Sequence, residues 1–327
     1  MRPPFDDWFG DAAFDATYGY DEAALLRVGA PDEPPGFAEF WQGLYRRALT
    51  VDPAPVLSAP VLSPAQQSGC GMRVHEVEFS SLGGVRLGGW VVLPADDEVS
   101  QAVVVGHGYG GRAEPDLTVV PERAAAIFPV SRGLETHGVL PGIPSSSAEH
   151  VLHGIDSVDT YVHGGCAADL WCAASALLQL LPIRPEGLNY LGGSFGGGIG
   201  ALALPWDPRF TAAALHVPSF GNHPLRLTLP CTGSGEAVRR YAQMNPHVAG
   251  VLRYFDAAVA ARHLRIPAVL GPALWDPAVP PPGQFAVCNA VAAEKELFVF
   301  SAGHADYPGD AEELDRFHQL AHKLFQG

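Results

Sequence analysis

The sequence has little positive charge. Its 327 residues include 20 lysines and arginines against 35 aspartates and glutamates, which gives a formal net charge of −15. The basic residues do not form a run anywhere in the sequence. Nucleic acids and anionic membranes attract clustered positive charge, so the sequence predicts neither as a partner. Neutral or cationic substrates fit this charge better, although an acidic surface that only maintains solubility is the simpler explanation.

Long apolar segments are absent as well. No stretch approaches the roughly 18 uninterrupted apolar residues of a membrane-spanning helix. The beginning of the chain, MRPPFDDWFGDAAFD, contains two prolines and several acidic residues where a secretory signal would need an apolar core. Together these absences predict a soluble, cytoplasmic protein.

Metal-binding patterns are also missing. The cysteines are odd in number and show no CxxC or Cys/His spacing, so they are expected to be free, mostly buried thiols. They are Cys70, Cys166, Cys172, Cys231 and Cys288. His150, His153 and His163 lie close together in the sequence, but no cysteine or carboxylate cluster of recognised pattern accompanies them. The sequence therefore predicts no metal and no cofactor.

Neither a low-complexity tract nor a change of composition divides the chain. Hydrophobic residues make up 47% of it, which is typical of a globular protein. A chain of this length can form one large α/β domain with a substantial core. We therefore expect a single domain over 1–327, with an N-terminal helical cap (1–50), a Pro/Ser-rich linker extended along the surface (51–69) and a main core (70–327).

Periodicity predicts a helix and a hairpin in the first hundred residues. Phe37, Phe40, Trp41 and Tyr45 share one face of a helix, which we expect to pack on the main core. Further along, MRVHEVEFSS alternates polar and apolar residues, SLGG supplies a turn, and VRLGGWVVLP forms a second strand. Residues 72–94 are therefore predicted to form a hairpin at an antiparallel sheet edge.

The rest of the chain alternates strands with helices. QAVVVGHGYGG is an apolar strand that ends in a glycine-rich loop, which is typical of a buried parallel strand, and AAAIFPVSRG repeats the pattern. Further strands are expected at 188–191, 212–216, 268–274 and 297–300, and helices at 167–181, 199–204 and 311–325. This alternation predicts a mostly parallel, doubly wound sheet with helices on both faces.

Ser194 lies in a GxSxG pentapeptide within LNYLGGSFGGGIG. A strand-like run precedes it and a helix-like run follows it, as in the nucleophile elbow of α/β-hydrolases. The glycines are needed there because a Cβ would collide with the neighbouring strand or helix. The sequence therefore predicts an α/β-hydrolase fold with Ser194 as the nucleophile.

A serine hydroxyl needs a base, and the base needs an orienting carboxylate. In this fold the chain order is serine, acid, histidine, each on a loop after a strand. The last two such loops offer Asp276, in AVLGPALWDPAVPP, and His304, in LFVFSAGHADYPG. Asp256 precedes the strand and is expected to cap or face a helix. Asp306 is too near His304 to orient it.

The oxyanion formed during attack needs two backbone N–H donors. Phe195, which follows the nucleophile, offers one, and the loop GHGYGG offers the other through Tyr109. His107 precedes Ser194 in the chain and is expected to hold this loop rather than to act as the base. The loop lacks the Walker lysine and the GxGxxG spacing, so no nucleotide is predicted to bind it.

With these residues placed, nearly the whole chain resembles the acetyl xylan esterase and cephalosporin C deacetylase family, carbohydrate esterase family seven. FAEFWQGLYRRAL, HGYGGR, Arg132-Gly133, GGSFGGG and WDPAVPPPGQFAVCN are similar to its characteristic stretches. The resemblance implies Ser194, Asp276 and His304 as the catalytic triad, and N–H groups of Tyr109 and Phe195 as the oxyanion hole. It also implies a homo-oligomer, often a hexamer, which restricts substrates to small molecules.

Three positions depart from the family's usual residues. Phe195 stands where the family has glutamine, Leu134 follows Arg132-Gly133 where it has glutamine, and Ala305 follows His304 where it has glutamate. A backbone donor survives a change of side chain, so the triad chemistry is expected to remain. We expect these three changes to alter the polar rim of the pocket and hence the choice of substrate.

The sequence thus predicts a serine carboxylic ester hydrolase that removes short acyl groups, above all acetyl, from small substrates through an acyl-enzyme. Two alternatives remain open. One is an acyl hydrolase of other specificity, including amide or peptide bonds, because the same triad serves both reactions. The other is a catalytically silent binding protein with a hydrolase fold.

Overall fold

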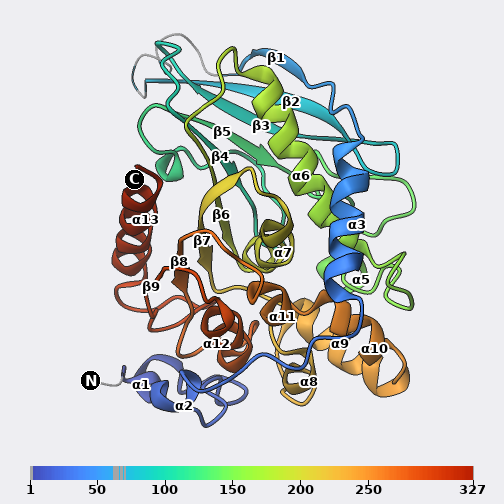
Figure 1. Cartoon of the computed structure of the whole chain (residues 1–327). Coiled ribbons are helices and arrows are strands. Elements are labelled where there is room, and N and C mark those ends of the chain that lie inside the picture. Colours follow the sequence, from blue (N-terminus) through green and yellow to red (C-terminus); the bar gives the residue numbers. More distant parts are fainter. Residues whose placement is uncertain (1–2, 62–65, 67–68, 70, 327) are drawn as a thin grey trace.

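A mixed sheet of nine strands lies at the centre of this computed structural model, which describes residues 3–61, 66, 69 and 71–326 (Figure 1). The strand order is β1-β2-β3-β5-β4-β6-β7-β8-β9. The strands are β1 (Val56–Pro60), β2 (Met72–Ser81), β3 (Val85–Pro94), β4 (Gln101–Val105), β5 (Ala124–Pro129), β6 (Gly187–Gly193), β7 (Phe210–His216), β8 (Ala268–Gly271) and β9 (Lys295–Leu297). Strands β4 to β9 run parallel to one another.

The antiparallel edge of the sheet contains the predicted hairpin. Met72 of β2 lies opposite Pro94 of β3, as a hairpin over 72–94 requires. The segment that we expected to be only a linker contributes a further strand, because β1 pairs with β2. An open strand edge carries unpaired backbone groups, and β1 satisfies them for β2. The linker between β1 and β2 lies partly outside the described residues.

The last two strands are shorter than predicted. β8 ends at Gly271 because the next residue, Pro272, has no N–H to continue the ladder. The pairing nevertheless persists past both strands, since Phe300 N donates to Pro272 O at 2.8 Å. The predicted strands at 268–274 and 297–300 are therefore regular only in part. These irregular extensions lead into the two loops that carry Asp276 and His304.

The helices of the described residues range from one turn to five. The α-helices are α1 (Phe5–Phe9), α2 (Glu22–Leu25), α3 (Phe37–Leu49), α5 (Ser147–His150), α6 (Val162–Leu180), α7 (Phe195–Ala203), α8 (His223–Arg226), α9 (Gly233–Met244), α10 (Val248–Leu252), α11 (Ala257–Ala261), α12 (Pro281–Ala290) and α13 (Asp310–Gln326). Three short 3-10 helices lie at Leu117–Val119, Leu204–Trp206 and Arg253–Phe255. Within the described part of the chain, no helix has the length and apolar character needed to cross a membrane.

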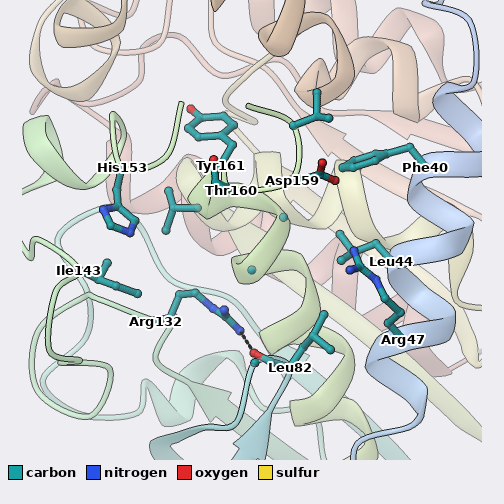
Figure 2. A pocket seen from close by; sticks show the side chains of 15 residues that line it. Phe40, Leu44, Arg47, Leu82, Arg132, Ile143, His153, Asp159, Thr160 and Tyr161 are labelled. Atoms are coloured by element: carbon teal, nitrogen blue, oxygen red, sulfur yellow. Dashed lines mark hydrogen bonds between the residues drawn. The ribbon is translucent and has the colours of Figure 1, made fainter. Parts of the chain in front are cut away.

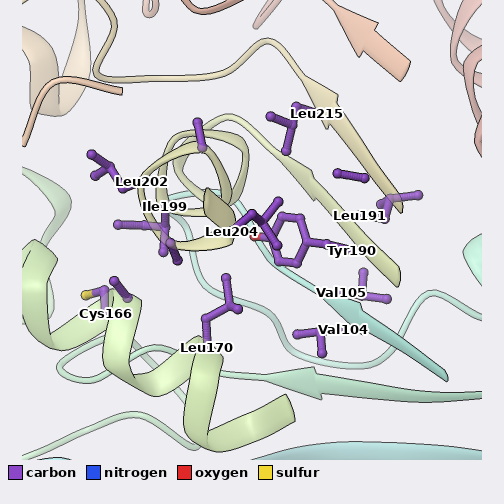
Figure 3. Packing of buried hydrophobic residues seen from close by; sticks show 14 of the residues in the cluster. Val104, Val105, Cys166, Leu170, Tyr190, Leu191, Ile199, Leu202, Leu204 and Leu215 are labelled. Atoms are coloured by element: carbon purple, nitrogen blue, oxygen red, sulfur yellow. The ribbon is translucent and has the colours of Figure 1, made fainter. Parts of the chain in front are cut away.

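Helices cover both faces of the parallel strands. Neighbouring residues of a strand point to opposite faces of its sheet. In β7, the His216 ring contacts Phe317 of α13, with ring centroids 5.5 Å apart. Leu215 points the other way and lies in the apolar cluster around α7 (Figure 3). The predicted α/β-hydrolase arrangement, with a doubly wound sheet and an antiparallel N-terminal edge, is confirmed.

The N-terminal segment packs at two separate places (Figure 1). The predicted aromatic helix is α3, which contacts α6; Trp41 is fully buried and its indole N–H donates to Tyr254 O at 2.8 Å. Burial of an aromatic side chain of this kind stabilises the fold by about 2–3 kcal/mol. The preceding α1 lies elsewhere, beside the loops after β8 and β9, where Phe9 stacks on Trp275 with centroids 3.8 Å apart.

A buried ion pair ties the antiparallel edge to α6. The Arg132 guanidinium donates to both oxygens of Asp169, at 2.7 Å and 3.0 Å, and to Leu82 O at 2.9 Å. The Ser81 hydroxyl completes the group by donating to Asp169 at 2.6 Å. The charge of Arg132 is thus fully matched. Four buried free thiols lie elsewhere in the core, and Cys70 lies outside the described residues.

Candidate active site

Ser194 stands at the turn between a strand and a helix. β6 ends at Gly193 and α7 begins at Phe195, so this one residue connects them. Its φ of 54° and ψ of −116° lie outside the regions that side-chain-bearing residues ordinarily adopt. Backbone hydrogen bonds hold the turn, because Ser194 N donates to His216 O at 2.8 Å. The predicted strand-turn-helix around Ser194 is confirmed.

The glycines on either side of Ser194 allow the backbone to approach its neighbours. A Cβ on Gly196 would lie 2.9 Å from His107 O, and one on Gly192 would lie 2.9 Å from the carbonyl carbon of Gly196. Real side chains essentially never come so close to backbone atoms. The steric reason predicted for the GxSxG glycines therefore holds in the structure.

The three residues predicted as a triad meet in one hydrogen-bonded chain. His304 Nε2 lies 2.8 Å from Ser194 Oγ, and His304 Nδ1 lies 2.7 Å from Asp276 Oδ2. Asp276 is fully buried, whereas the His304 side chain retains 27% of its accessible surface. Ser194 and His304 are 110 positions apart in the sequence, and Asp276 and His304 are 28 apart, so the parallel strands bring distant loops to one edge of the sheet.

The Asp276 carboxylate is satisfied on both oxygens. Oδ1 accepts from the N–H groups of Ala278 and Val279, each at 2.9 Å. Oδ2 accepts from Gln284 Nε2 at 2.9 Å as well as from His304. Gln284 is fully buried on α12, and no sequence pattern indicated its role, because only the fold brings it to the acid. These bonds fix the orientation of the carboxylate toward the imidazole.

The bond to Asp276 sets the protonation of His304. An ionised carboxylate only accepts, so Nδ1 of His304 carries a proton and Nε2 presents its lone pair to the Ser194 hydroxyl. Burial alone would lower the pKa of His304, but the hydrogen bond and the charge of Asp276 outweigh burial and raise it. His304 is therefore arranged to accept a proton from Ser194 and to carry it as an imidazolium.

The loops of the acid and the base are held by backbone bonds. Gly303 N donates to Trp275 O at 2.8 Å, which joins the loop after β9 to the loop after β8. Asp276 N donates to Ala16 O at 3.1 Å, which joins the acid loop to the N-terminal segment. Sequence patterns did not predict that residues before α3 would support the acid, because this contact spans most of the chain.

His107 holds the glycine-rich loop after β4, as predicted. Its Nδ1 bonds Gly108 O at 2.7 Å, and its Nε2 accepts from Ser131 N at 3.0 Å. Burial lowers the pKa of His107 to about 4, so the ring stays neutral at physiological pH. In addition, His107 O accepts from Gly196 N at 2.9 Å, which fixes this loop against the start of α7.

The two residues predicted to form the oxyanion hole lie on facing segments. The Tyr109 and Phe195 rings are in contact, with centroids 4.5 Å apart. Neither backbone N–H has a hydrogen-bond acceptor among the described residues. Within the described part of the chain both donors are therefore unused, and their role in the oxyanion hole remains a prediction.

The expectation that Phe195 and Leu134 alter a polar rim is wrong. Both side chains are only 1% exposed and belong to the main core. The Phe195 ring lies among other aromatic rings, 5.8 Å from His107 and 6.0 Å from Phe220 between centroids. An apolar side chain suits this enclosed position, whereas a polar rim residue would need access to solvent. Of the three departures, only Ala305 is partly exposed.

The rejected acid has the capping role predicted for it. Asp256 is the N-cap of α11, and its Oδ1 accepts from Ala258 N at 3.0 Å and Val259 N at 3.3 Å. Among the described residues, no group of three or more histidines, cysteines and carboxylates is placed to hold a metal. His150 and His163 instead contact the Tyr109 hydroxyl, at 3.0 Å and 3.3 Å.

A hollow of about 200 Å³ lies between α3 and the segment that leads into α6 (Figure 2). Arg132 and Tyr161 line it, but none of the triad residues does. In Figure 2 the Tyr161 hydroxyl points away from the hollow. This hollow is therefore separate from the candidate active site.

The fold and the hydrogen-bonded Ser-His-Asp chain place the protein in the class of α/β-hydrolases. Residues 27–322 match the acetyl xylan esterase (AXE1) family, and the chain belongs to this family. The predicted resemblance is confirmed to that extent. The protein is thus a member of a family of carboxylic ester hydrolases.

Solved structures share this fold over nearly the whole chain. Acetyl xylan esterase 1 from Thermoanaerobacterium sp. JW/SL YS485 superposes with a TM-score of 0.79 at 17% identity, covering 95% of this chain and 100% of the other. Acetyl xylan esterase from Paenibacillus sp. R4 gives 0.76 at 20% identity, covering 92% and 99%. An acylaminoacyl peptidase from Pyrococcus horikoshii gives 0.61 at 13% identity, with coverage of 84% and 48%.

Proposed function

We propose that the protein is a serine esterase that removes acetyl groups from small substrates through an acyl-enzyme. The observation that carries this proposal is the continuous chain from Ser194 Oγ through His304 to Asp276, with heavy-atom distances of 2.8 Å and 2.7 Å. These distances lie within the range that proton transfer requires. Family membership supports ester hydrolysis, and the names of the similar structures support acetyl as the acyl group.

In the first half of the reaction, Ser194 Oγ attacks the acetyl carbonyl carbon. The hydroxyl proton moves to His304 Nε2, and Asp276 stabilises the imidazolium that results. The carbonyl oxygen becomes an oxyanion, and the N–H groups of Tyr109 and Phe195 are the donors that we propose to stabilise it. When the tetrahedral intermediate collapses, His304 returns the proton to the leaving alkoxide, and the alcohol departs.

The second half uses the same groups with water as the nucleophile. His304 Nε2 takes a proton from water as the water oxygen attacks the acetylated Ser194. Collapse of this intermediate breaks the bond to Ser194 Oγ, which regains the proton from His304. Acetate leaves, and the enzyme returns to its starting state without any cofactor.

The wider setting of this reaction follows from the sequence and the family resemblance. We propose a small-molecule ester as the substrate, without nucleic acid or membrane as a partner, and a cytoplasmic location. A homo-oligomer, such as the hexamer of similar proteins, would restrict access to small substrates. The net charge of −15 and the lack of basic clusters support the proposal that neither nucleic acid nor a membrane is a partner.

The proposed chemistry is tested with p-nitrophenyl esters and an active-site label. We expect hydrolysis of p-nitrophenyl acetate, with kcat/KM at least about tenfold lower for the octanoyl ester, since each misfit methylene group costs discrimination energy. A fluorophosphonate probe should label one serine. A protein that is inert to both reagents would be a silent binding protein, and faster cleavage of p-nitroacetanilide than of the acetate would favour the amidase alternative.

The pH dependence of kcat/KM is a separate expectation. Only neutral His304 accepts the serine proton, and Asp276 raises the pKa of His304 above its ordinary value near 6.5. The rate should therefore fall as the pH decreases through a single ionisation, with a midpoint above about 6.5. Initial rates measured from pH 5 to 9 give this midpoint. A midpoint well below that of a free histidine would argue against His304 as the base.

A further inference from the structure

Five buried side-chain atoms lack a hydrogen-bond partner among the described residues. They are Tyr18 Oη, Tyr161 Oη, His163 Nδ1, His223 Nδ1 and Arg226 Nε. Buried polar groups in folded proteins are nearly always paired, because an unpaired group loses its hydration without compensation. A set of unpaired atoms in one region therefore indicates a partner that the protein itself does not supply.

Arg226 is the most unusual member of this set. Its side chain is at the end of α8 and only 4% exposed, yet within the described residues its guanidinium makes neither a hydrogen bond nor an ion pair. The other deeply placed arginines behave differently, since Arg132 pairs with Asp169 and Arg209 pairs with Asp207. A buried charge without a counter-ion is strongly unfavourable. The Nε of Arg226 is therefore left free to bind a negative group, since none of the described residues accepts from it.

The other four unpaired atoms belong to side chains on which the charge of Arg226 acts: His223 lies on α8 with Arg226, and the Tyr161 and His163 rings are in contact, with centroids 4.4 Å apart. Burial raises the pKa of Tyr18 and Tyr161, and the charge of Arg226 opposes the rise in both. Burial lowers the pKa of His163 and His223, and the charge of Arg226 adds to the decrease. One guanidinium thus acts electrostatically on all four side chains. We call these five residues the Arg226 cluster.

The Arg226 cluster adjoins the candidate active site on two sides. Its member His163 contacts the Tyr109 hydroxyl at 3.3 Å, on the loop that is placed to supply an oxyanion donor. On the other side, Thr232 N donates to Pro277 O at 2.7 Å, which joins the segment after α8 to the acid loop. A Cβ on Gly235 would collide with the Arg226 guanidinium, so α9 begins directly against it. The cluster is thus linked to the oxyanion loop through His163, and to the acid loop through the segment that follows α8.

Hydrogen bonds determine which atoms of the cluster donate and which accept. His150 Nε2 donates to Arg132 O at 2.8 Å, so its Nδ1 accepts from the Tyr109 hydroxyl. The Tyr109 oxygen then accepts from His163 Nε2, which leaves His163 Nδ1 as a bare lone pair. His223 likewise donates from Nε2 to a backbone carbonyl, at 3.2 Å, and keeps a lone pair on Nδ1. The cluster thus offers a cation and two hydroxyls together with two acceptors.

We propose that Arg226 binds a carboxylate of the substrate, so that the preferred substrates are acetyl esters of hydroxy acids. A guanidinium matches the planar, two-oxygen geometry of a carboxylate, and the hydroxyls of Tyr18 and Tyr161 can donate to the same group. His163 and His223 can accept from further hydroxyls of the alcohol. This inference rests on the proposed esterase function. The net charge alone favours neutral or cationic substrates. The proposal revises this expectation, because the nearby charge of Arg226 acts on the substrate more strongly than distant acidic side chains, whose charges are screened by salt.

The test compares charged and neutral esters of the same shape. We expect wild-type kcat/KM for 3- or 4-acetoxybenzoate to exceed that for the corresponding acetoxybenzamide by about 10- to 100-fold, as a charge-assisted hydrogen bond provides. Arg226→Gln should remove this preference, because it should lower kcat/KM for the benzoates about 10- to 100-fold more than for the benzamides. Benzoate should inhibit phenyl acetate hydrolysis by the wild type more strongly than benzamide does, and Arg226→Gln should abolish this difference.

A matched charge control is available on α9. Arg240 is exposed and pairs with Glu236, so Arg240→Gln removes the same charge without touching the cluster and should keep the preference for carboxylates. The proposal is overturned if the wild type hydrolyses neither acetoxybenzoate faster than the corresponding acetoxybenzamide and benzoate inhibits no better than benzamide. It is also overturned if Arg226→Gln lowers kcat/KM for the charged and the neutral esters equally. The wild-type comparison decides even where Arg226→Gln fails to fold. Absence of hydrolysis of every ester would instead refute the esterase function itself.

Discussion

Replacement of Ser194 by alanine is expected to lower kcat/KM for p-nitrophenyl acetate by at least about 10⁴-fold, because it removes the atom that forms the acyl-enzyme. The loss should lie in kcat, since the oxyanion donors are backbone groups that Ser194→Ala does not alter. Steady-state kinetics on the purified variant measure it. Labelling by a fluorophosphonate probe should disappear at the same time.

Ser175→Ala provides a matched hydroxyl deletion for Ser194→Ala. The Ser175 hydroxyl lies on α6, where it donates to Trp171 O at 3.0 Å and accepts from Arg209 Nη1 at 2.7 Å; neither bond involves the triad. This variant should keep wild-type kinetics, and both variants should keep the wild-type circular dichroism spectrum. Activity of Ser194→Ala within about tenfold of the wild type would mean that another residue is the nucleophile.

Replacement of Asp276 by asparagine is expected to lower kcat by about 10⁴-fold. Oδ1 of Asp276 accepts from Ala278 N and Val279 N, so the carbonyl oxygen of an asparagine must keep that side. Its NH₂ group then faces His304 Nδ1 and forces this nitrogen to accept. The proton of neutral His304 would move to Nε2, which could no longer take the proton of Ser194.

Asp256 offers a control of the same chemistry and the same burial. Both aspartates are fully buried and accept backbone N–H groups, two for Asp276 and four for Asp256, but the hydrogen bonds of Asp256 go to the starts of α8 and α11 instead of to His304. Asp256→Asn should therefore lower the thermal melting temperature with little effect on kcat. Equal losses of kcat in the two variants would show that Asp276 acts only through stability. Burial raises the pKa of Asp256 to about 6, so its loss of charge is also tolerated more easily.

Local sequence patterns were sufficient where a contact lies within one segment. The glycines around Ser194 predict a strand-turn-helix because a tight turn at this spacing leaves no room for side chains beside the serine, and the structure has this turn. The order serine, acid, histidine then selected Asp276 and His304 from their rivals, since parallel strands bring successive loops to one sheet edge. The structure places these side chains within hydrogen-bond distance.

Sequence patterns did not predict the environment of a side chain correctly where its neighbours come from distant segments. Phe195 was expected to shape a polar rim because it replaces a polar residue of the family, but it is enclosed by rings from the loop after β4 and from Phe220. The role of Gln284 was not predicted, because its partner Asp276 lies eight positions away and no sequence motif connects the two residues. Pro272 shortened β8 for a local reason, yet pairing with Phe300 still continues past the end of that strand.

The sequence by itself determined the class of fold, the elbow at Ser194 and the identity of the acid and the base, because each depends on backbone geometry or on chain order. Only the tertiary structure decided the burial and pairing of individual side chains. Arg226 shows the difference most clearly. Its surroundings are drawn from the N-terminal segment, the glycine-rich loop, α6 and α8, and an unpaired charge is recognised only when every neighbour that could neutralise it has been placed.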